Sequence, residues 1–546
     1  MNWDEIAEIL DTEVFQKTRR HLKEVENIVL QGAWQGKTYE QIEATCQYSL
    51  SYLKQAAGPK LWKLLSEVLE EDIGKINFRV VLERRWGREQ PRELITQSHA
   101  VTQDRTASKA DWEKAPETTV LYGRDRELKL LQQSIVKDRC RLVTIFGMGG
   151  MGKTALAIHC AKQIQTQFDG VIWRSLHYVS GAAELVGELL SCFAKQSDRV
   201  NSDNLDRKIS NLIEYLRRDR YLIVLDTATE IWQSGDLAGH YRQQYKGYSE
   251  LLRRLATESH QSCLLLCTRE QPREIAFLEG ENTFVRSLHL DGLTSGAENI
   301  FQEKGLLDPH RWDETIELYR ANPLALKIVA TTIQELFGGS VAAFLQQDTI
   351  VYGDIYDLLD EQFERLSSLE QEIVNWFAIA QQPLSLSQLQ ANILLPMEMA
   401  KLIEALESLI RRSLIAKTKV KNAVLFSLDQ PVVIQYAINR SIEVICEEIT
   451  EANDRQDFSQ IEFLRNYALV SGNKEIRQRQ LNKIIIPLKN KLYRVFRDES
   501  AIAACLQVIL LSLKDKTPLA VGYARDNLQT LLEELNSDLN NYQKQP

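Results

Sequence analysis

The sequence predicts a multidomain protein of α and α/β type, built around a doubly wound parallel sheet. Residues 141–160 read as a buried strand, a glycine-rich turn and an apolar-periodic helix in immediate succession. Beyond that turn, strand-like apolar runs alternate with helical stretches, the pattern of a parallel sheet with helices on both faces. Helical periodicity dominates the chain before residue 90 and after residue 287. We therefore expect helical domains on either side of one central α/β domain.

The composition is that of a folded globular protein. The chain has 546 residues, of which 44% are hydrophobic, enough for about three or four domains. Its formal net charge of -9 argues against non-specific coating of nucleic acid, although it leaves room for a local basic patch. No apolar run approaches the roughly 20 residues that span a membrane, and the start lacks the pattern of a signal peptide. We expect a cytoplasmic protein without a membrane partner.

The eight cysteines are scattered along the chain. The nearest pair, Cys263 and Cys267, lies in an apolar run that looks like a buried strand. The sequence contains no CxxC motif, no Cys/His ladder with the spacing of metal ligands, and no Ser/His/Asp or Cys/His constellation. We expect the cysteines and histidines to have structural roles.

The first 90 residues read as all helix and contain the layout of a helix-turn-helix. Thr38 and Gln41 form a capping box, and Ser49 is the expected N-cap of a second helix that ends at a Gly-Pro pair. The polar face of that second helix, which includes Lys54 and Gln55, suits a DNA major groove. The same fold is also a common protein-interaction module, so DNA binding and protein binding both stay open. The helix after the Gly-Pro pair has a core-facing stripe of Leu61, Leu65 and Val68.

The glycine-rich turn, residues 147–154, matches the phosphate-loop motif GxxxxGK[ST]. Its glycines let backbone N–H groups curl around a phosphate chain at a helix N-terminus, where unsatisfied donors favour negative charge. Lys153 would reach the β- and γ-phosphates, and Thr154 would supply a hydroxyl for Mg²⁺. The residues expected to hold the phosphates are Gly147, Met148, Gly149, Gly150, Met151, Gly152, Lys153 and Thr154.

Four strand-like runs follow the loop, and two of them end in candidate site residues. YLIVLD ends in Asp226, at the carboxyl end of a strand, where a carboxylate can hold Mg²⁺ through water. CLLLCT is followed by Arg269 at another such end. The four runs are residues 170–176, 221–226, 263–268 and 284–290, and the most regular helices between them are 205–218 and 248–258.

Residues past about 287 are predicted to be helical. The most distinctive segment is ANPLALKIVATTIQELF, residues 321–337. Residues 368–440 resemble a winged helix, and the last hundred or so are amphipathic helix, with 506–513 apolar enough to need a partner surface. The winged-helix elements expected are helices at about 373–380 and 398–412 and strands at 413–417 and 423–428.

The order YGRDREL, GMGGMGKT, FDGVIWRSL, YLIVLD, CTRE, NPLALK and winged helix resembles the NB-ARC family of signal-transducing ATPases with numerous domains, the STAND class, over about residues 118–440. The N-terminal region looks like the helix-turn-helix domain that precedes NB-ARC and WD-repeat domains in some bacterial proteins. The domains expected are a helix-turn-helix domain (1–90), a linker (91–117), a P-loop nucleotide-binding domain (118–286), a helical domain (287–367), a winged helix (368–440) and a helical C-terminal domain (441–546).

The resemblance implies ATP or ADP and Mg²⁺ as cofactors, and it implies three further site residues. Arg124 and its neighbours would line the side of the nucleotide base. Pro323 of NPLALK would pack near adenine and ribose, and Arg269 would sense the γ-phosphate.

The sequence departs from the family pattern at three positions. Thr227 stands where an acidic residue often follows the Walker B aspartate, which leaves Glu230 as a weak substitute for activating water. Ala321 stands where a glycine is usual. Gln430 stands where the family has a winged-helix histidine that contacts the ADP β-phosphate. The positive charge of that histidine would then have to come from another residue, Arg411 or Arg412.

The function that the resemblance implies is a nucleotide-operated switch. ADP would hold the domains closed, whereas ATP with Mg²⁺ would favour an open form that self-associates, with slow hydrolysis and an effector protein or DNA at the N-terminal module. The alternative is an ATP-responsive transcription regulator that binds DNA through the helix-turn-helix. A P-loop enzyme acting on a small molecule is a third reading, for which the chain offers no acceptor site. No WD, leucine-rich or tetratricopeptide period is visible as a sensor.

Overall fold

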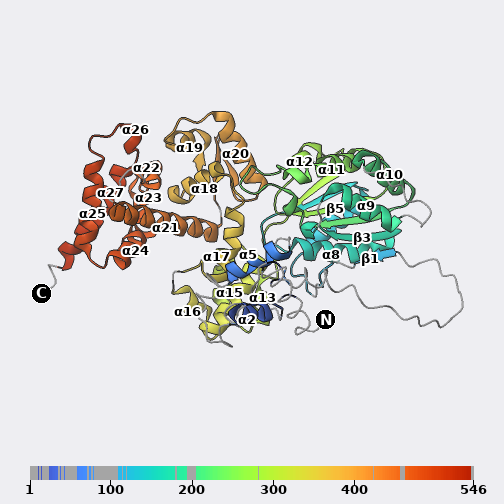
Figure 1. The fold of residues 1–546 in the computed structure, drawn as a ribbon, viewed down its shortest axis with the longest axis horizontal. Helices are drawn as coiled ribbons and strands as arrows, with labels where there is room; N and C mark the ends of the chain where they lie inside the picture. The colour runs from blue at the N-terminus through green and yellow to red at the C-terminus, as the bar shows by residue number, and fades with distance from the viewer. Residues whose placement is uncertain are drawn as a thin grey trace. The chain divides into compact units, whose positions relative to one another are not determined.

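In the computed structural model the chain divides into two compact units, residues 1–105 and 106–546 (Figure 1). Each unit has its own apolar core. The structure describes residues 10, 14, 17, 22, 24–34, 37, 42, 58–69, 73, 74, 78, 109–112, 115–117 and 120–542, apart from 179, 180, 194–203, 281, 348, 422, 429 and 456–460.

The first unit contains two described helices, α2 (Glu24–Trp34) and α5 (Gly58–Leu69). Helix α5 begins at the Gly-Pro pair, because proline fits the first turn of a helix, where its missing N–H needs no partner. Its predicted stripe is confirmed, since Leu61, Leu65 and Val68 are buried. The capping box, the second helix of the helix-turn-helix and its polar face with Lys54 and Gln55 lie outside the described residues.

The second unit is organised around a six-stranded sheet in which every paired strand is parallel, in the order β1-β3-β4-β5-β2-β6. The four strands predicted after the phosphate loop are present as β3 to β6. The strands are β1 (Lys109–Asp111), β2 (Leu142–Phe146), β3 (Gly170–Ser175), β4 (Tyr221–Asp226), β5 (Cys263–Thr268) and β6 (Val285–His289).

Both faces of the sheet are buried, as a doubly wound sheet requires. In β4, Leu222 and Val224 belong to one apolar cluster, whereas Ile223 and Leu225 belong to the other. Figure 1 shows α8 on one side of the sheet and α9, α10 and α11 on the other. The elements here are α7 (Asp125–Gln132), η2 (Gln133–Lys137), α8 (Lys153–Ile164), η3 (Gln165–Gln167), η4 (Leu176–Tyr178), α9 (Ala182–Phe193), α10 (Leu205–Arg218), η5 (Ala228–Ile231), η6 (Gln243–Tyr245), α11 (Gly247–Thr257) and α12 (Arg273–Leu278).

Strand β1 corrects the prediction that residues 91–117 form only an exposed linker. It pairs in parallel with β3, in the register Lys109 to Gly170. Trp112 stacks on the buried Trp173 with ring centroids 6.2 Å apart. Three residues are too short to show the alternation by which a strand is recognised in a sequence.

Helices follow the sheet. Helix α15 begins two residues later than the predicted segment 321–337, because Arg320 and Ala321 adopt left-handed φ of 51° and 49° and Asn322 is the N-cap. The helices are α13 (Ala297–Glu303), η7 (Pro309–Arg311), α14 (Trp312–Leu318), α15 (Pro323–Leu336), α16 (Val341–Leu345) and α17 (Gly353–Phe363).

Residues 368–440 contain helices and a three-stranded antiparallel sheet in the order β7-β9-β8. The strand predicted at 413–417 begins at Ala416 instead. Ser413 turns the chain with φ of 59°, and Leu414 and Ile415 are buried before the strand starts, so their apolar character reflects core packing. The elements are α18 (Ser368–Ala380), β7 (Leu384–Ser385), α19 (Leu386–Asn392), α20 (Met399–Arg411), β8 (Ala416–Val420) and β9 (Ala423–Ser427).

The last part of the chain is helical in its described residues, and α21 is continuous across the domain boundary predicted at 440. Within the apolar run 506–513, Leu506 and Ile509 are buried, but Leu511 is 64% exposed. No described helix is long and apolar enough to cross a membrane. The helices are α21 (Pro431–Arg455), α22 (Glu462–Asn466), α23 (Lys474–Gln480), η8 (Leu481–Ile485), α24 (Ile486–Phe496), α25 (Glu499–Ser512), α26 (Pro518–Val521) and α27 (Ala524–Tyr542).

Candidate functional site

The phosphate loop joins the end of β2 to the start of α8, next to the carboxyl ends of neighbouring strands. Its glycines Gly147, Gly150 and Gly152 all have positive φ, of 153°, 79° and 88°. A Cβ at Gly147 would lie 2.3 Å from the carbonyl oxygen of Leu290, and one at Gly150 would lie 2.7 Å from Oδ1 of Asn322. Both the backbone conformation and the close packing therefore require glycine in this loop.

Lys153, the first residue of α8, reaches back over the loop. Its Nζ donates hydrogen bonds to the carbonyl oxygens of Gly147 at 2.8 Å and Met148 at 2.7 Å. Burial lowers the pKa of Lys153 to about 8, and the positive charge of Arg269 lowers it further. An ammonium group with so little water around it, at a helix N-terminus, favours an anion.

Thr154 and Asp226 face each other across the loop. The hydroxyl of Thr154 donates to the Asp226 carboxylate, with Oγ1 3.0 Å from Oδ1 and 3.1 Å from Oδ2. Burial raises the pKa of Asp226, and the hydrogen bonds from Thr154 and from the backbone of Thr227 oppose that rise. A hydroxyl and a carboxylate are oxygen ligands of the kind that Mg²⁺ takes, usually with phosphate oxygens completing its shell.

The structure holds no cluster of three His, Cys, Asp or Glu side chains suited to a metal ion within the described part of the chain. Mg²⁺ needs no such cluster, because it is usually bound by one or two carboxylates together with substrate phosphates. Thr154 and Asp226 thus fit the ion that the motif implies.

The residues after Asp226 place a hydroxyl, not a second carboxylate, at the end of β4. Thr227 has φ of 57°, an outlier for a β-branched residue, and its Oγ1 lies 3.4 Å from Oγ of Ser175. The carboxylate of Glu230 lies 3.8 Å from the guanidinium of Arg242. Glu230 is therefore paired with a cation of its own.

Arg269 lies beside the phosphate loop. A Cβ built on Gly149 of the loop would be 3.8 Å from the Cζ atom of Arg269. Its guanidinium forms an ion pair of 2.7 Å with Glu361 of α17. Its backbone N–H donates to Oγ1 of Thr229 at 2.9 Å. A loop after β4 and a helix beyond the sheet therefore both touch Arg269.

Arg124 is buried and holds the backbone of the loop. Its guanidinium donates to the carbonyl oxygens of Met151 at 3.0 Å, Asp291 at 2.6 Å and Gly292 at 3.2 Å, and it pairs with Glu127 at 3.2 Å. Burial lowers the pKa of Arg124. The arginine of YGRDREL thus ties the phosphate loop to the chain that follows β6.

Pro323 begins α15, whose N-terminus packs on the phosphate loop. Asn322, the N-cap, donates from Nδ2 to the carbonyl oxygen of Gly149 at 2.9 Å, and the N–H of Leu324 donates to Gly150 at 3.3 Å. Asn322 is a site residue that the sequence reading missed, although an Asn directly before a Pro is a typical helix start. The left-handed φ of Ala321 explains why the family pattern has glycine there.

Gln430 is buried against the loop, and its Nε2 lies 2.7 Å from the sulfur of Met148. It lines a cavity of about 360 Å³ together with Met151, Asp291 and Arg320. Arg412, one of the two arginines considered as a substitute for the histidine, instead donates to the buried Glu270 and Glu370. Arg320, missed in the sequence, is the arginine that borders this cavity.

Comparison with known proteins identifies two domain families. Residues 124–285 match the NB-ARC domain. Residues 1–85 match the N-terminal HTH of vWA-MoxR associated proteins.

Relatives of the whole chain include an uncharacterised WD repeat-containing protein of Nostoc sp., 35% identical over 533 residues, which cover 90% of this chain and 41% of the relative. The chain thus spans less than half the length of that relative. A disease resistance protein of Arabidopsis thaliana is 28% identical over 137 residues, 23% of this chain and 14% of the relative. A STAND protein with a tetratricopeptide repeat sensor from Pyrococcus horikoshii is 18% identical and covers 78% of this chain and 60% of its own, with a TM-score of 0.28. The family matches confirm what the motifs predicted: this chain carries an NB-ARC domain at residues 124–285, preceded by a helix-turn-helix domain at residues 1–85.

Proposed function

We propose that this protein is a nucleotide-operated switch, which binds ADP or ATP with Mg²⁺ at the phosphate loop and changes its domain arrangement and self-association accordingly. The observation that carries this proposal is that the loop is touched by three segments far apart in the chain, through Arg124, Asn322 and Gln430. A ligand shifts an equilibrium only when it binds two arrangements differently. A nucleotide at this loop meets side chains from all three segments, so its affinity depends on how they are arranged.

The chain's own residues divide the work of binding. The loop N–H groups and Lys153 hold the phosphates, and Thr154 and Asp226 hold Mg²⁺, which supplies charge neutralisation between phosphate oxygens when it is bound. Arg269 lies beside the loop, directly after β5, the strand next to β2, and is the residue proposed to contact the γ-phosphate. The residues after 368 form a winged helix that carries Gln430 to the nucleotide.

Hydrolysis is expected to be slow. Thr227 offers no carboxylate to activate water, and Glu230 is paired with Arg242. We expect steady-state phosphate release well below the roughly 1 to 100 s⁻¹ of kinases. Rapid turnover by the isolated protein would favour an enzyme over a switch.

Calorimetry with ADP and with ATP-Mg²⁺ tests the site. Lys153→Ala should nearly abolish binding of both nucleotides while the fold is kept, and Asp226→Asn should lose mainly the part that depends on Mg²⁺. Lys129→Ala, an exposed lysine on α7, is the matched control and should bind as the wild type does. Unchanged affinity in a folded Lys153→Ala protein would remove the site assignment.

The N-terminal helix-turn-helix domain is the proposed output module, with an effector protein as its partner. The alternative, a DNA-binding regulator, depends on Lys54 and Gln55, which lie outside the described residues. No contact in the described part of the first unit favours it. Binding of a duplex that falls steeply with salt, and is weakened by Lys54→Ala, would reverse this preference.

A further inference from the structure

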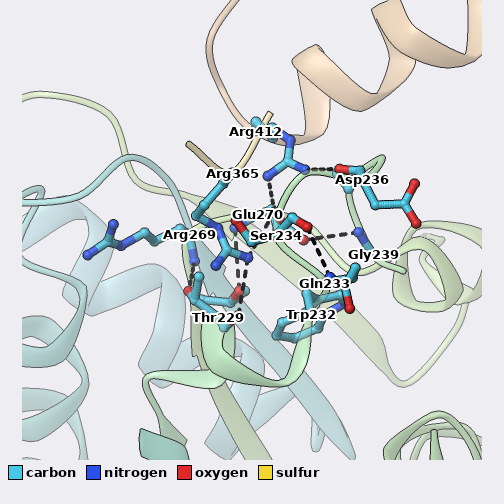
Figure 2. Close-up of polar contacts among 12 residues, drawn as sticks. Thr229, Trp232, Gln233, Ser234, Asp236, Gly239, Arg269, Glu270, Arg365 and Arg412 are labelled. Carbon is cyan, nitrogen blue, oxygen red and sulfur yellow. Dashed lines mark hydrogen bonds and ion pairs between the residues drawn. The ribbon is translucent and has the colours of Figure 1, made fainter. Parts of the chain in front are cut away.

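A cluster of four charged side chains is buried between segments that are far apart in the chain. Glu270, Glu370, Arg365 and Arg412 are 1%, 0%, 9% and 5% exposed. Glu270 follows β5 of the sheet, whereas Arg412 is the C-cap of α20, and the other two flank the start of α18. We call these four residues the latch cluster; Figure 2 shows Arg412 reaching from its helix toward Glu270.

Arg412 is the centre of the latch cluster. Its Nη1 donates to Oε2 of Glu270 at 2.6 Å, and its Nε donates to Oε1 of Glu370 at 3.0 Å. Its Nη2 donates to the carbonyl oxygen of Asp236 at 2.6 Å. One guanidinium thus uses all three of its nitrogens. One binds the segment between β4 and β5, and another binds Glu270, the second residue after β5.

The segment after β4 is hydrogen-bonded to Glu270 of the latch cluster and to Ser408, a residue bound to Glu370 of that cluster. The N–H of Gly239 donates to Oε1 of Glu270 at 3.0 Å, and the N–H of Ala238 donates to Oγ of Ser408 at 2.6 Å. Ser408, on α20, in turn donates to Glu370 at 2.6 Å. The amide of Ala238 therefore has its acceptor on α20, and the amide of Gly239 has its acceptor on Glu270, the glutamate that Arg412 binds.

The latch cluster is joined directly to the nucleotide site. Glu270 is the neighbour of Arg269, the arginine beside the phosphate loop. Thr229, three residues after Asp226, accepts from the N–H of Arg269 with its Oγ1 at 2.9 Å. Its carbonyl oxygen accepts from Arg365 of the latch cluster at 3.2 Å (Figure 2). A shift of the Arg269 backbone therefore acts directly on Glu270 and on Thr229.

The buried charges of the latch cluster depend on one another. Its two acids and two bases balance, and buried charges are tolerated only when they are paired and hydrogen-bonded. Removing one charge leaves its partner buried without compensation. Separation of α20 from the sheet relieves that cost, because water then solvates every member.

We propose that Glu270 and Arg412 form a latch that holds α20 against the sheet and that the nucleotide releases through Arg269. This inference rests on the proposed function and adds the element that transmits it. Glu270 is a positioning residue, since it acts on Arg269 and on α20 and does not itself reach the phosphates.

The test uses the full chain with Glu270→Gln, Arg412→Met and the double variant. Gln keeps an acceptor for Gly239 but loses the charge that faces Arg412. Each single variant should speed the release of a fluorescent ADP analogue at least about fivefold, the lower end of typical coupling between sites. Because both changes break the same pair, the double variant should release ADP about as fast as the faster single, not at the product of the two effects.

A second readout needs no nucleotide. The amides of Ala238 and Gly239 should exchange hydrogen faster in both variants, because their acceptors are held by the latch. If nucleotide binding is absent in the wild type while these amides still respond, the proposed function fails and the contact between α20 and the sheet stands. If Arg412→Met does not fold, ADP release and amide exchange in Glu270→Gln, the milder change, test the latch on their own.

Arg174→Met is the matched control. Arg174 is also buried and also paired with two acids, Asp111 at 2.8 Å and Glu188 at 3.3 Å, but these three residues lie on β3, β1 and α9, and none belongs to α20 or to the latch cluster. It should lower the melting temperature without changing ADP release or exchange at Ala238 and Gly239. Folded Glu270→Gln and Arg412→Met proteins with wild-type ADP release and wild-type exchange at both amides would overturn the latch.

Discussion

At the scale of single residues, Lys153 shows how the fold prepares a side chain for phosphate. Its ammonium group sits among loop carbonyl oxygens, with Arg269 near enough to lower its pKa further. Those carbonyl oxygens hold the ammonium in place but offer no formal negative charge. A phosphate supplies that charge, so the nucleotide and not the protein completes the pairing of Lys153.

This leads to a prediction about pH. The pKa of Lys153 is lowered to about 8, so raising the pH through that value removes its positive charge in the free protein. A bound phosphate stabilises the ammonium and raises the pKa, so nucleotide binding above the free pKa takes up a proton. Affinity should fall as pH rises past about 8, and calorimetry in buffers of different ionisation enthalpy should report the uptake. An affinity that stays constant as the pH passes about 8, or binding without proton uptake, would contradict this assignment.

Gln430 gives a second prediction at this scale. It is buried beside Met148 in the cavity next to the loop, but it carries no charge. A charged donor to phosphate is worth about 1 kcal/mol more than a neutral one, which corresponds to about a fivefold change. Gln430→His should therefore slow the release of ADP about fivefold below the histidine pKa, and Gln430→Ala should speed it only modestly. Equal release rates in all three proteins would place the residue away from the phosphates.

At the scale of elements, the sequence predicted the helices, strands and turns whose formation depends on neighbouring residues. The phosphate loop, the four strands after it and α10 were predictable, because glycine spacing and apolar runs report on neighbouring residues. Strand β1 was not predictable, since three residues show no alternation of apolar and polar side chains. Its pairing with β3 also joins residues that are far apart in the sequence. Arg412 was misplaced for the same reason, because its partner Glu270 is 142 residues away.

The N-terminus of α15 supports a prediction about one element. Asn322 caps the helix and also holds Gly149 of the loop. Asn322→Ala should lower the melting temperature, from the loss of about 1 kcal/mol of capping, and should also weaken ADP binding. Asn204→Ala removes an equivalent cap from α10, away from the loop, and should lower stability alone. A loss of ADP affinity in both variants would assign the effect to general stability.

At the scale of the whole molecule, the described contacts within residues 106–546 converge on two places. One is the phosphate loop, which Arg124, Asn322 and Gln430 reach from separate segments. The other is the latch cluster around Arg412. Both are made by residues distant in sequence, so a change at the nucleotide can alter contacts across much of this unit without unfolding any helix or strand.

The last prediction concerns assembly. If ATP with Mg²⁺ separates α20 from the sheet, the surface around Ala238, which is buried and bonded to Ser408 of α20, becomes available to a second copy of the chain. We expect the mass of one chain in ADP and a larger mass with Mg²⁺ and an ATP analogue that resists hydrolysis, measured by light scattering. Lys153→Ala should keep one mass in both conditions, because it binds neither nucleotide. Glu270→Gln should begin to associate already in ADP, since its latch is weakened. The same mass for the wild type in both nucleotides would rule out assembly as the output, and the switch would then have to act through a change within a single chain.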